Sequence, residues 1–199
     1  MSVSARVLVL HLGLLALLFV LQFVLPPFHH GNLARIMVLA SYAVGYNILF
    51  GYTGLLSLGH ALFFAAGMYG MGLTIQHFGF TPAPAILVGT LAGAVVAAGL
   101  AFLALRTVGV AFMIVTLMFA QAGYLTVLYF GEYTRGDEGF VIQTAQRVLW
   151  GIDLSDPTNR YFAAWVLFAV SLIVCLRLVR APFGRTLVAI RENEERVRM

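Results

Sequence analysis

The chain has 199 residues, of which 61% are hydrophobic and 10% are charged, and its formal net charge is +4. Soluble domains carry about 25% charged and about 45–50% apolar residues, so a soluble fold of this length could not bury so much apolar surface. The composition therefore excludes a soluble enzyme and predicts an integral membrane protein, because lipid accepts apolar side chains.

The cationic residues narrow the class of protein further, because all 12 of them are arginine. The absence of lysine excludes a phosphate-binding P-loop and Schiff-base chemistry. The arginines stand at the ends of apolar runs and in a C-terminal cluster, which is typical of membrane orientation rather than of nucleic-acid binding. The one cysteine, Cys175, lies inside an apolar run, which excludes an intrachain disulfide and a cysteine-based zinc site.

Six apolar runs approach the length of a membrane-spanning helix, which needs about 20 residues. In chain order they are residues 7–25, 36–50, 58–76, 84–105, 110–130 and 161–179. The first run is too long for a signal peptide and lacks a small-residue cleavage site, so we expect an uncleaved helix. The fourth run has closely spaced Gly and Ala residues, typical of helices that pack tightly in a membrane. The runs predict an all-α, polytopic membrane helix bundle.

The arginines also predict the orientation of the bundle. Six of them lie at or after the end of the last run, and the positive-inside rule places this tail in the cytoplasm. Six spans then place the N-terminus with Arg6, and the connection with Arg106, on the same side. The outer side receives the loop of residues 131–160 and the four remaining arginines, Arg35, Arg135, Arg147 and Arg160.

The segment of residues 181–199 has the pattern of a separate amphipathic helix. It starts with Pro182, a favourable first helical residue, and Phe183, Leu187, Ile190 and Val197 recur near one face. Two Glu–Arg pairs at i,i+4 spacing support the same helix. It is predicted to be either an interfacial helix on the cytoplasmic leaflet or a docking helix for a cytoplasmic partner.

Polar side chains within the apolar runs are candidates for a solute pathway, because they are costly in lipid unless paired or facing a cavity. The candidates are Asn47, Ser57, His60, Thr116 and Gln121. Asn47 is also suited to an interhelical hydrogen bond, and Thr116 to a bond with its own helix. Gln121 has four hydrogen-bonding sites to satisfy, so it is the stronger candidate.

Gly51, Gly54 and Gly59 interrupt the helical pattern while apolar residues continue. Non-helical backbone at membrane depth is tolerated only inside protein or along a cavity, and broken helices form the binding sites of some transporters. The alternative is a short cytoplasmic turn. Ser57 and His60 follow closely, but no G-x-S-x-G motif surrounds the serine and no carboxylate lies in any run, which disfavours an intramembrane hydrolase. His60 is then either a packed or water-facing ring, or a gating residue.

Three stretches occur in order along most of the chain. They are YNILFGYTGLLSLGHA at residues 46–61, GVAFMIVTLMFAQ at 109–121 with TRGDEG at 134–139, and PFGRTLVAIRENE at 182–194. Together they resemble the LivM-type permease subunit of branched-chain amino acid ABC importers. Arg135 stands where the family has a glycine. Because family members continue with further membrane helices, residues 1–199 are expected to be a single permease domain truncated at its C-terminus.

The resemblance implies a division of labour. The chain would be a transport subunit of the bacterial plasma (inner) membrane without an ATPase site, cofactor or metal of its own. Its partners would be a second permease subunit, two cytoplasmic ATP-binding subunits and an extracytoplasmic substrate-binding protein. The third stretch would couple to an ATP-binding subunit, through residues that match the family motif: Gly184, Arg185, Ile190, Arg191, Glu192 and Glu194.

Two other functions remain open. The same machinery could import urea, short amides or other amino acids instead of branched-chain amino acids. An ion-coupled secondary transporter is the alternative from another class, and such proteins often carry charged residues within their helices. All eight carboxylates lie in the loop of residues 131–160 or in the C-terminal tail, which counts against ion coupling.

Overall fold

The computed structural model describes residues 3–193, so Glu194 lies outside the described part. Within that range the chain is helical apart from turns and one small hairpin, and the predicted all-α class is confirmed. The chain divides into two compact units, each with most of its contacts internal. Unit 1 comprises Met1–Gly45 and Asp153–Arg185, and unit 2 comprises Tyr46–Ile152 and Thr186–Met199. The single permease domain of residues 1–199 stays a prediction.

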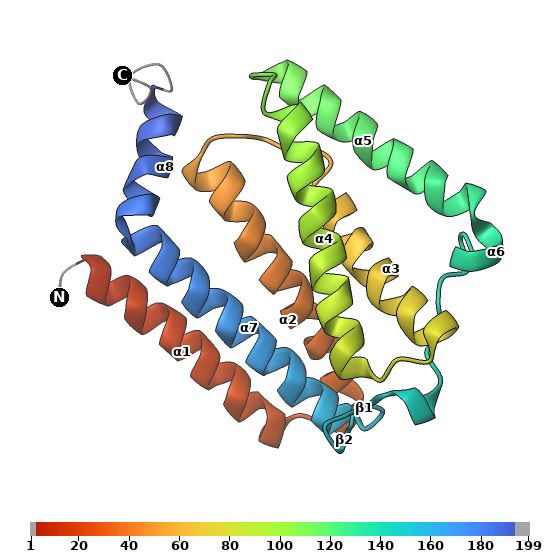
Figure 1. Ribbon diagram of the computed structural model, residues 1–199. Helices are drawn as coiled ribbons and strands as arrows, with labels where there is room; N and C mark the ends of the chain where they lie inside the picture. Colours follow the sequence, from red (N-terminus) through yellow and green to blue (C-terminus); the bar gives the residue numbers. More distant parts are fainter. Residues whose placement is uncertain (1–2, 194–199) are drawn as a thin grey trace. The chain divides into compact units, whose positions relative to one another are not determined.

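Unit 1 contains α1 (Val3–Val24), most of α2 (Pro27–Asn47) and α7 (Pro157–Arg180). Figure 1 shows α1 and α7 side by side. The Tyr161 hydroxyl donates to the Leu18 carbonyl and the Trp165 indole to the Leu15 carbonyl, so the two helices run antiparallel. The start of α1 therefore lies at the same end of the unit as the end of α7.

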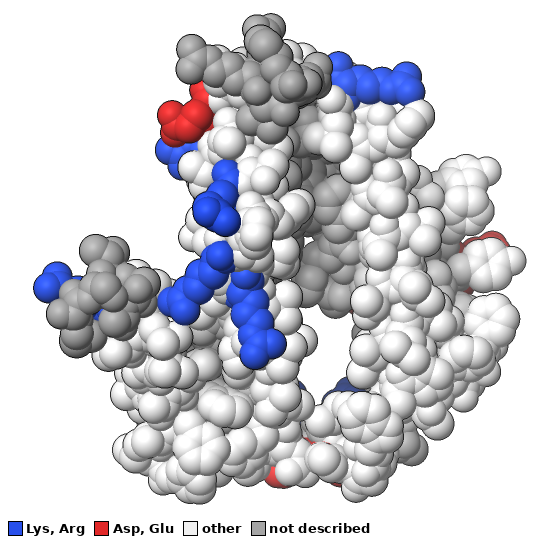
Figure 2. All heavy atoms as spheres, turned by 60° about the vertical axis from the view of Figure 1, so that its left-hand side comes forward, with Lys and Arg blue, Asp and Glu red and all other residues white. Residues whose placement is uncertain are grey.

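The core of unit 1 is small compared with its apolar surface. Tyr161, Met37 and Phe168 are buried in one cluster with side chains of α1 and α2. On α1, however, Leu10 and Val24 are each 71% exposed. Uncharged residues form most of the face shown in Figure 2. Such a surface suits lipid rather than water.

Unit 2 contains α3 (Ala61–Phe78), α4 (Pro82–Ala104) and α5 (Val110–Tyr129). Helices α3 and α4 form the closest pair, because glycines meet at their crossing. A Cβ atom on Gly89 would lie 2.6 Å from the Gly67 carbonyl oxygen, and one on Gly70 would lie 2.7 Å from the Ala92 Cβ. The tight packing predicted from the small residues of the fourth run is thus observed.

The loop between α5 and α7 is partly structured. It holds α6 (Gly131–Thr134), η2 (Thr144–Gln146) and a hairpin of β1 (Val148–Leu149) and β2 (Ile152–Asp153). Arg135 ends α6 with φ 59°, a left-handed conformation that glycine adopts more easily. The turn therefore forms with arginine at a position whose backbone conformation favours glycine.

Five of the described helices are long and apolar enough to cross a membrane: Arg6–Val24, Pro27–Tyr52, Pro82–Ala104, Val110–Tyr129 and Pro157–Arg180. The third predicted span forms α3, which is not among the five because it is short and contains glycines and a polar Gln76-His77 end. Two spans start four or more residues earlier than predicted. Helix α2 begins at Pro27, which brings Arg35 inside it, and α7 begins at Pro157 after an Asp156 cap.

The predicted C-terminal helix is α8 (Pro182–Glu192). Gly184 is buried, Leu187 and Ile190 are half-buried, and Arg185, Arg191 and Glu192 are exposed. The helix is therefore amphipathic as predicted, although Phe183 of the predicted apolar face is 54% exposed.

Candidate functional site

The centre of the candidate site is a break after α2. There the helix widens into the π-helical turn η1 (Ile48–Tyr52), in which the Thr53 amide donates to the Ile48 carbonyl over 3.3 Å. Non-helical backbone follows as far as His60, with Gly54 at φ 75°. We call residues 48–60 the helix break. Wide turns of this kind are frequent at functional sites, because they free backbone groups from the regular pattern.

The helix break packs against α5 at Thr116. The Leu58 amide donates to Thr116 Oγ1 over 3.2 Å, and the same hydroxyl donates to the Met113 carbonyl over 2.9 Å. A Cβ atom on Gly59 would overlap with the Thr116 carbonyl oxygen. Only glycine allows this approach, since neither backbone can move aside alone. The predicted residues Gly59 and Thr116, 57 positions apart in the chain, are therefore in contact.

This packing leaves a cavity of about 260 Å³ between the helix break, α4 and α5, which we call the break cavity. Its walls are mainly apolar and include Ala101 and Phe112. Its polar side chains are those of Ser57, His60 and Thr116, three of the five residues predicted for a solute pathway. The non-helical backbone thus lines a cavity within unit 2, and lining a cavity is one of the conditions under which such backbone is tolerated at membrane depth.

His60 is held by aromatic side chains. Its ring centroid lies 5.0 Å from that of Tyr46 and 5.3 Å from that of Phe63. The Tyr46 hydroxyl also donates to the Ser57 carbonyl over 2.9 Å. Tyr46 therefore contacts both Ser57 and His60, the two polar residues of this turn. Sequence reasoning missed its role, although it begins the first of the three family-like stretches.

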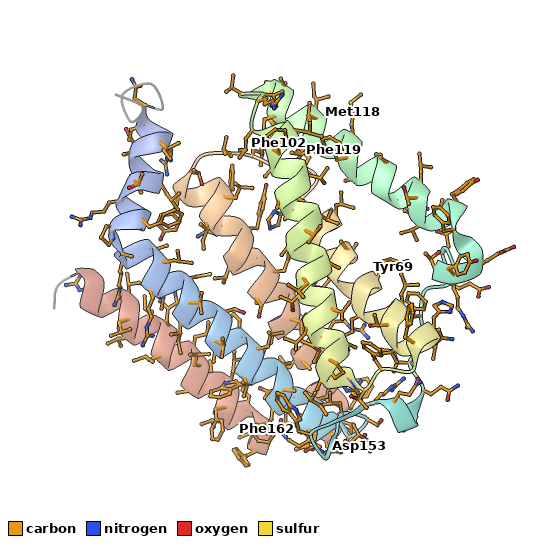
Figure 3. All side chains as sticks on the ribbon, viewed as in Figure 1. Tyr69, Phe102, Met118, Phe119, Asp153 and Phe162 are labelled. Carbon is orange, nitrogen blue, oxygen red and sulfur yellow. The ribbon has the colours of Figure 1, made fainter. Side chains whose placement is uncertain are left out.

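A larger cavity of about 720 Å³ runs between α3, α4, α5 and the loop after α6, and we call it the loop cavity. Tyr69 and Phe119, both labelled in Figure 3, line it. Its charged group is Asp137, whose Oδ1 accepts a hydrogen bond from the Tyr124 hydroxyl over 3.1 Å. Leu100 and Phe119 line both cavities and therefore mark the boundary between them. No polar pattern in the sequence signalled these two apolar residues.

Two predicted pathway residues lie elsewhere. Asn47 is exposed, and its carboxamide occupies the space that a side chain on Gly51 would need. Gln121 is exposed on α5 and lines neither cavity. Their part in a pathway stays a prediction.

The predicted coupling residues lie on α8. Gly184 is buried against the end of α7. A Cβ atom there would overlap with the Val179 carbonyl oxygen, so the position requires glycine. Arg191 Nη1 donates to the Gly51 carbonyl over 2.8 Å, which connects α8 to the helix break. Arg185 and Glu192 are exposed and Ile190 is half-buried. Among the described residues, no cluster of three His, Cys, Asp or Glu side chains could hold a metal ion.

The apolar spans and the cavities at a broken helix define the class: a polytopic membrane protein with internal space for a solute. Comparison with protein families gives a more particular assignment. Residues 31–199 match the family described as the branched-chain amino acid transport system, permease component. The chain belongs to this family.

Two curated relatives are similar to the chain. Both are described as the high-affinity branched-chain amino acid transport system permease protein LivM. The Escherichia coli (strain K12) protein is 30% identical over 181 residues, and the Salmonella typhimurium protein is 33% identical over 187 residues. Each match covers 79% of this chain but 42% of the relative, so the chain spans less than half of their length. No solved structure matches the chain.

Proposed function

We propose that this chain is the membrane-spanning subunit of an ATP-driven importer for branched-chain amino acids. The break cavity is the observation that carries the proposal, because it gives a member of this permease family a mainly apolar space with a few polar groups. An aliphatic side chain suits the apolar walls, while the polar ends of an amino acid need the hydrogen-bonding groups. Partner subunits that bind and hydrolyse ATP would supply the energy.

In this proposal the solute passes between the loop cavity and the break cavity. Ser57, His60 and Thr116 contact it in the break cavity, and Phe119 with Leu100 separates the two spaces until the helices move. The chain itself carries out no chemical step. It alternates the exposure of the site to the two sides of the membrane.

We also propose the bacterial plasma membrane as the location, with the N-terminus and α8 in the cytoplasm. Arg6 at the start of α1 and Arg177 and Arg180 at the end of α7 lie at the same end of unit 1, because the two helices are antiparallel. A shared cluster of arginines at one end agrees with the positive-inside rule. Helix α8 would then meet a cytoplasmic ATP-binding subunit, and the loop after α6 would face a substrate-binding protein.

The test is uptake of labelled leucine, with urea in parallel, by cells that lack their own system and carry the intact gene with its partner genes. We expect leucine uptake that requires this chain and stops when the ATPase is inactivated. Urea uptake without leucine uptake would change the substrate and retain the importer. Leucine uptake that survives loss of the ATPase would overturn the proposal.

A matched pair of variants tests whether the break cavity is the pathway. Ala101→Leu fills the cavity from α4, and we expect leucine uptake to fall about tenfold or more. Ala98→Leu adds the same side chain at an exposed position of the same helix and should retain uptake. Both proteins must be present in the membrane at wild-type amounts. Equal uptake by the two variants would place the pathway elsewhere.

A further inference from the structure

The contact between α8 and the helix break is a direct link across the sequence. Arg191 lies in the last turn of α8, and its Nη1 donates to the Gly51 carbonyl over 2.8 Å although 140 positions separate the two residues. Both belong to unit 2. The acceptor lies near the end of the single turn of η1, where helix carbonyls run out of amide partners. A guanidinium is well suited to such a carbonyl, because it adds positive charge at the negative end of the helix.

The helix break also makes room for the stem of this arginine. Gly54 has φ 75°, and a Cβ atom there would lie 3.0 Å from Arg191 Cγ and 3.7 Å from Arg191 Cβ. The side chain of Arg191 therefore packs along residues 51–54 as well as donating to them. A side chain at position 54 would both strain the backbone and push the arginine away.

The contacted turn forms part of the cavity wall. Leu49, in the same π-helical turn as Gly51, lines the break cavity together with Ser57 and Gly59. The Leu58 amide in turn donates to Thr116 on α5. Helix α8 is thus joined to the cavity wall through one side chain and one turn of backbone.

We infer that Arg191 is a positioning residue that ties α8 to the helix break, so that movement of α8 reshapes the break cavity. The inference rests on the proposed function and refines it. Arg191 acts inside this chain, whereas contact with the ATP-binding subunit falls to other residues of α8. Its loss should therefore uncouple ATP hydrolysis from import without releasing the ATP-binding subunit.

The first measurement is the amount of leucine imported per ATP hydrolysed by the complete transporter in proteoliposomes. For Arg191→Ala we expect this ratio to fall about fivefold or more, with ATP-binding subunits still co-purifying at the wild-type ratio. Arg106→Ala is the control, because it removes another arginine, one that stacks on Phe102 in the α4–α5 connection. Its ratio should stay within twofold of the wild type.

A disulfide rescue gives the second measurement. The 3.7 Å between a Cβ atom built at position 54 and Arg191 Cβ falls within the range of about 3.5–4.5 Å seen in disulfides. We expect Gly54→Cys with Arg191→Cys, in a Cys175→Ser background, to cross-link on oxidation. The oxidised protein should show a ratio at least threefold above that of the same protein after reduction, a comparison in which the strain of a side chain at position 54 is present in both states.

Three results would overturn the inference: an unchanged ratio in Arg191→Ala, loss of the ATP-binding subunit from that variant, or a cross-linked cysteine pair whose ratio does not exceed that of its reduced form. Failure of the proposed function would look different, because the wild-type transporter itself would then import no leucine with ATP.

Discussion

At the scale of single residues, Thr116 is the residue of the break cavity whose hydroxyl both accepts and donates a hydrogen bond. It is 7% exposed, and its hydroxyl accepts from the Leu58 amide while donating to the Met113 carbonyl. One hydroxyl therefore satisfies a buried backbone amide of the helix break, on a residue that lines the cavity. An amide left unpaired in such a place costs about 1–3 kcal/mol.

Thr116→Val and Thr116→Ser separate this role from side-chain volume. Valine keeps the shape but leaves the Leu58 amide without its acceptor, so we expect the free energy of unfolding to fall by about 1–3 kcal/mol, and leucine uptake to fall with it. Serine keeps the hydroxyl and should retain both properties more fully. Thermal unfolding in detergent and uptake in cells are the measurements. A valine variant as stable as the serine variant would contradict this role.

At the scale of elements, the α3–α4 pair is held by close backbone approach. The crossing near Gly67 and Gly89 leaves no room for a side chain, whereas Gly99, later on α4, has open space around it. In lipid, where no hydrophobic effect drives helices together, this approach and its dispersion contacts supply the attraction. Since α3 follows the helix break and α4 lines the break cavity, their spacing also sets the shape of the site.

Gly89→Ala and Gly99→Ala test this packing on one helix. The first places a methyl group 2.6 Å from the Gly67 carbonyl oxygen, so we expect a loss of about 1–3 kcal/mol as the helices are forced apart. The second meets nothing and should be neutral or stabilise the helix by about 0.5–1 kcal/mol. Thermal unfolding of the two proteins in one detergent measures the difference. Similar unfolding temperatures would show that the crossing tolerates a side chain.

At the scale of the whole molecule, the antiparallel packing of α1 and α7 restricts the number of membrane crossings. If only the five most apolar spans crossed, the first and the last would run in the same direction. Their observed antiparallel pairing requires an even number of crossings, so if all five of these spans cross we predict that α3 crosses as well. Helix α3 is compatible with crossing because Gly67 and Gly70 face α4 and Gly72 faces Phe140, so its glycines pack against protein.

Cysteine labelling from one side of the membrane tests this count. In a Cys175→Ser background, we expect Arg6→Cys and Val188→Cys to react from the cytoplasmic side and Phe80→Cys, in the α3–α4 connection, from the outside. A membrane-impermeant maleimide applied to intact cells and to inverted vesicles makes the measurement. Positions 6 and 80 labelled from the same side would show that α3 does not cross.

The sequence by itself determined the membrane class, the helical fold and the family-like stretches. Apolar runs of spanning length leave few other solutions in lipid, and small residues on α4 required a close partner. It also pointed to Ser57, His60 and Thr116, because polar groups are rare and costly inside apolar runs. The same reasoning selected Asn47 and Gln121, which the structure places at exposed positions, because polarity alone does not tell which face of a helix a side chain occupies.

Only the tertiary structure decided which of these residues meet. Tyr46 and Phe119 entered the site through packing, a property that no local pattern of apolar residues encodes. The sequence pointed to Arg191 as a residue for coupling to an ATP-binding subunit, and only the structure shows that it donates to a backbone carbonyl 140 positions away. The physical reason is that sequence periodicity fixes a residue's direction on its own helix, whereas its partner depends on how distant helices pack.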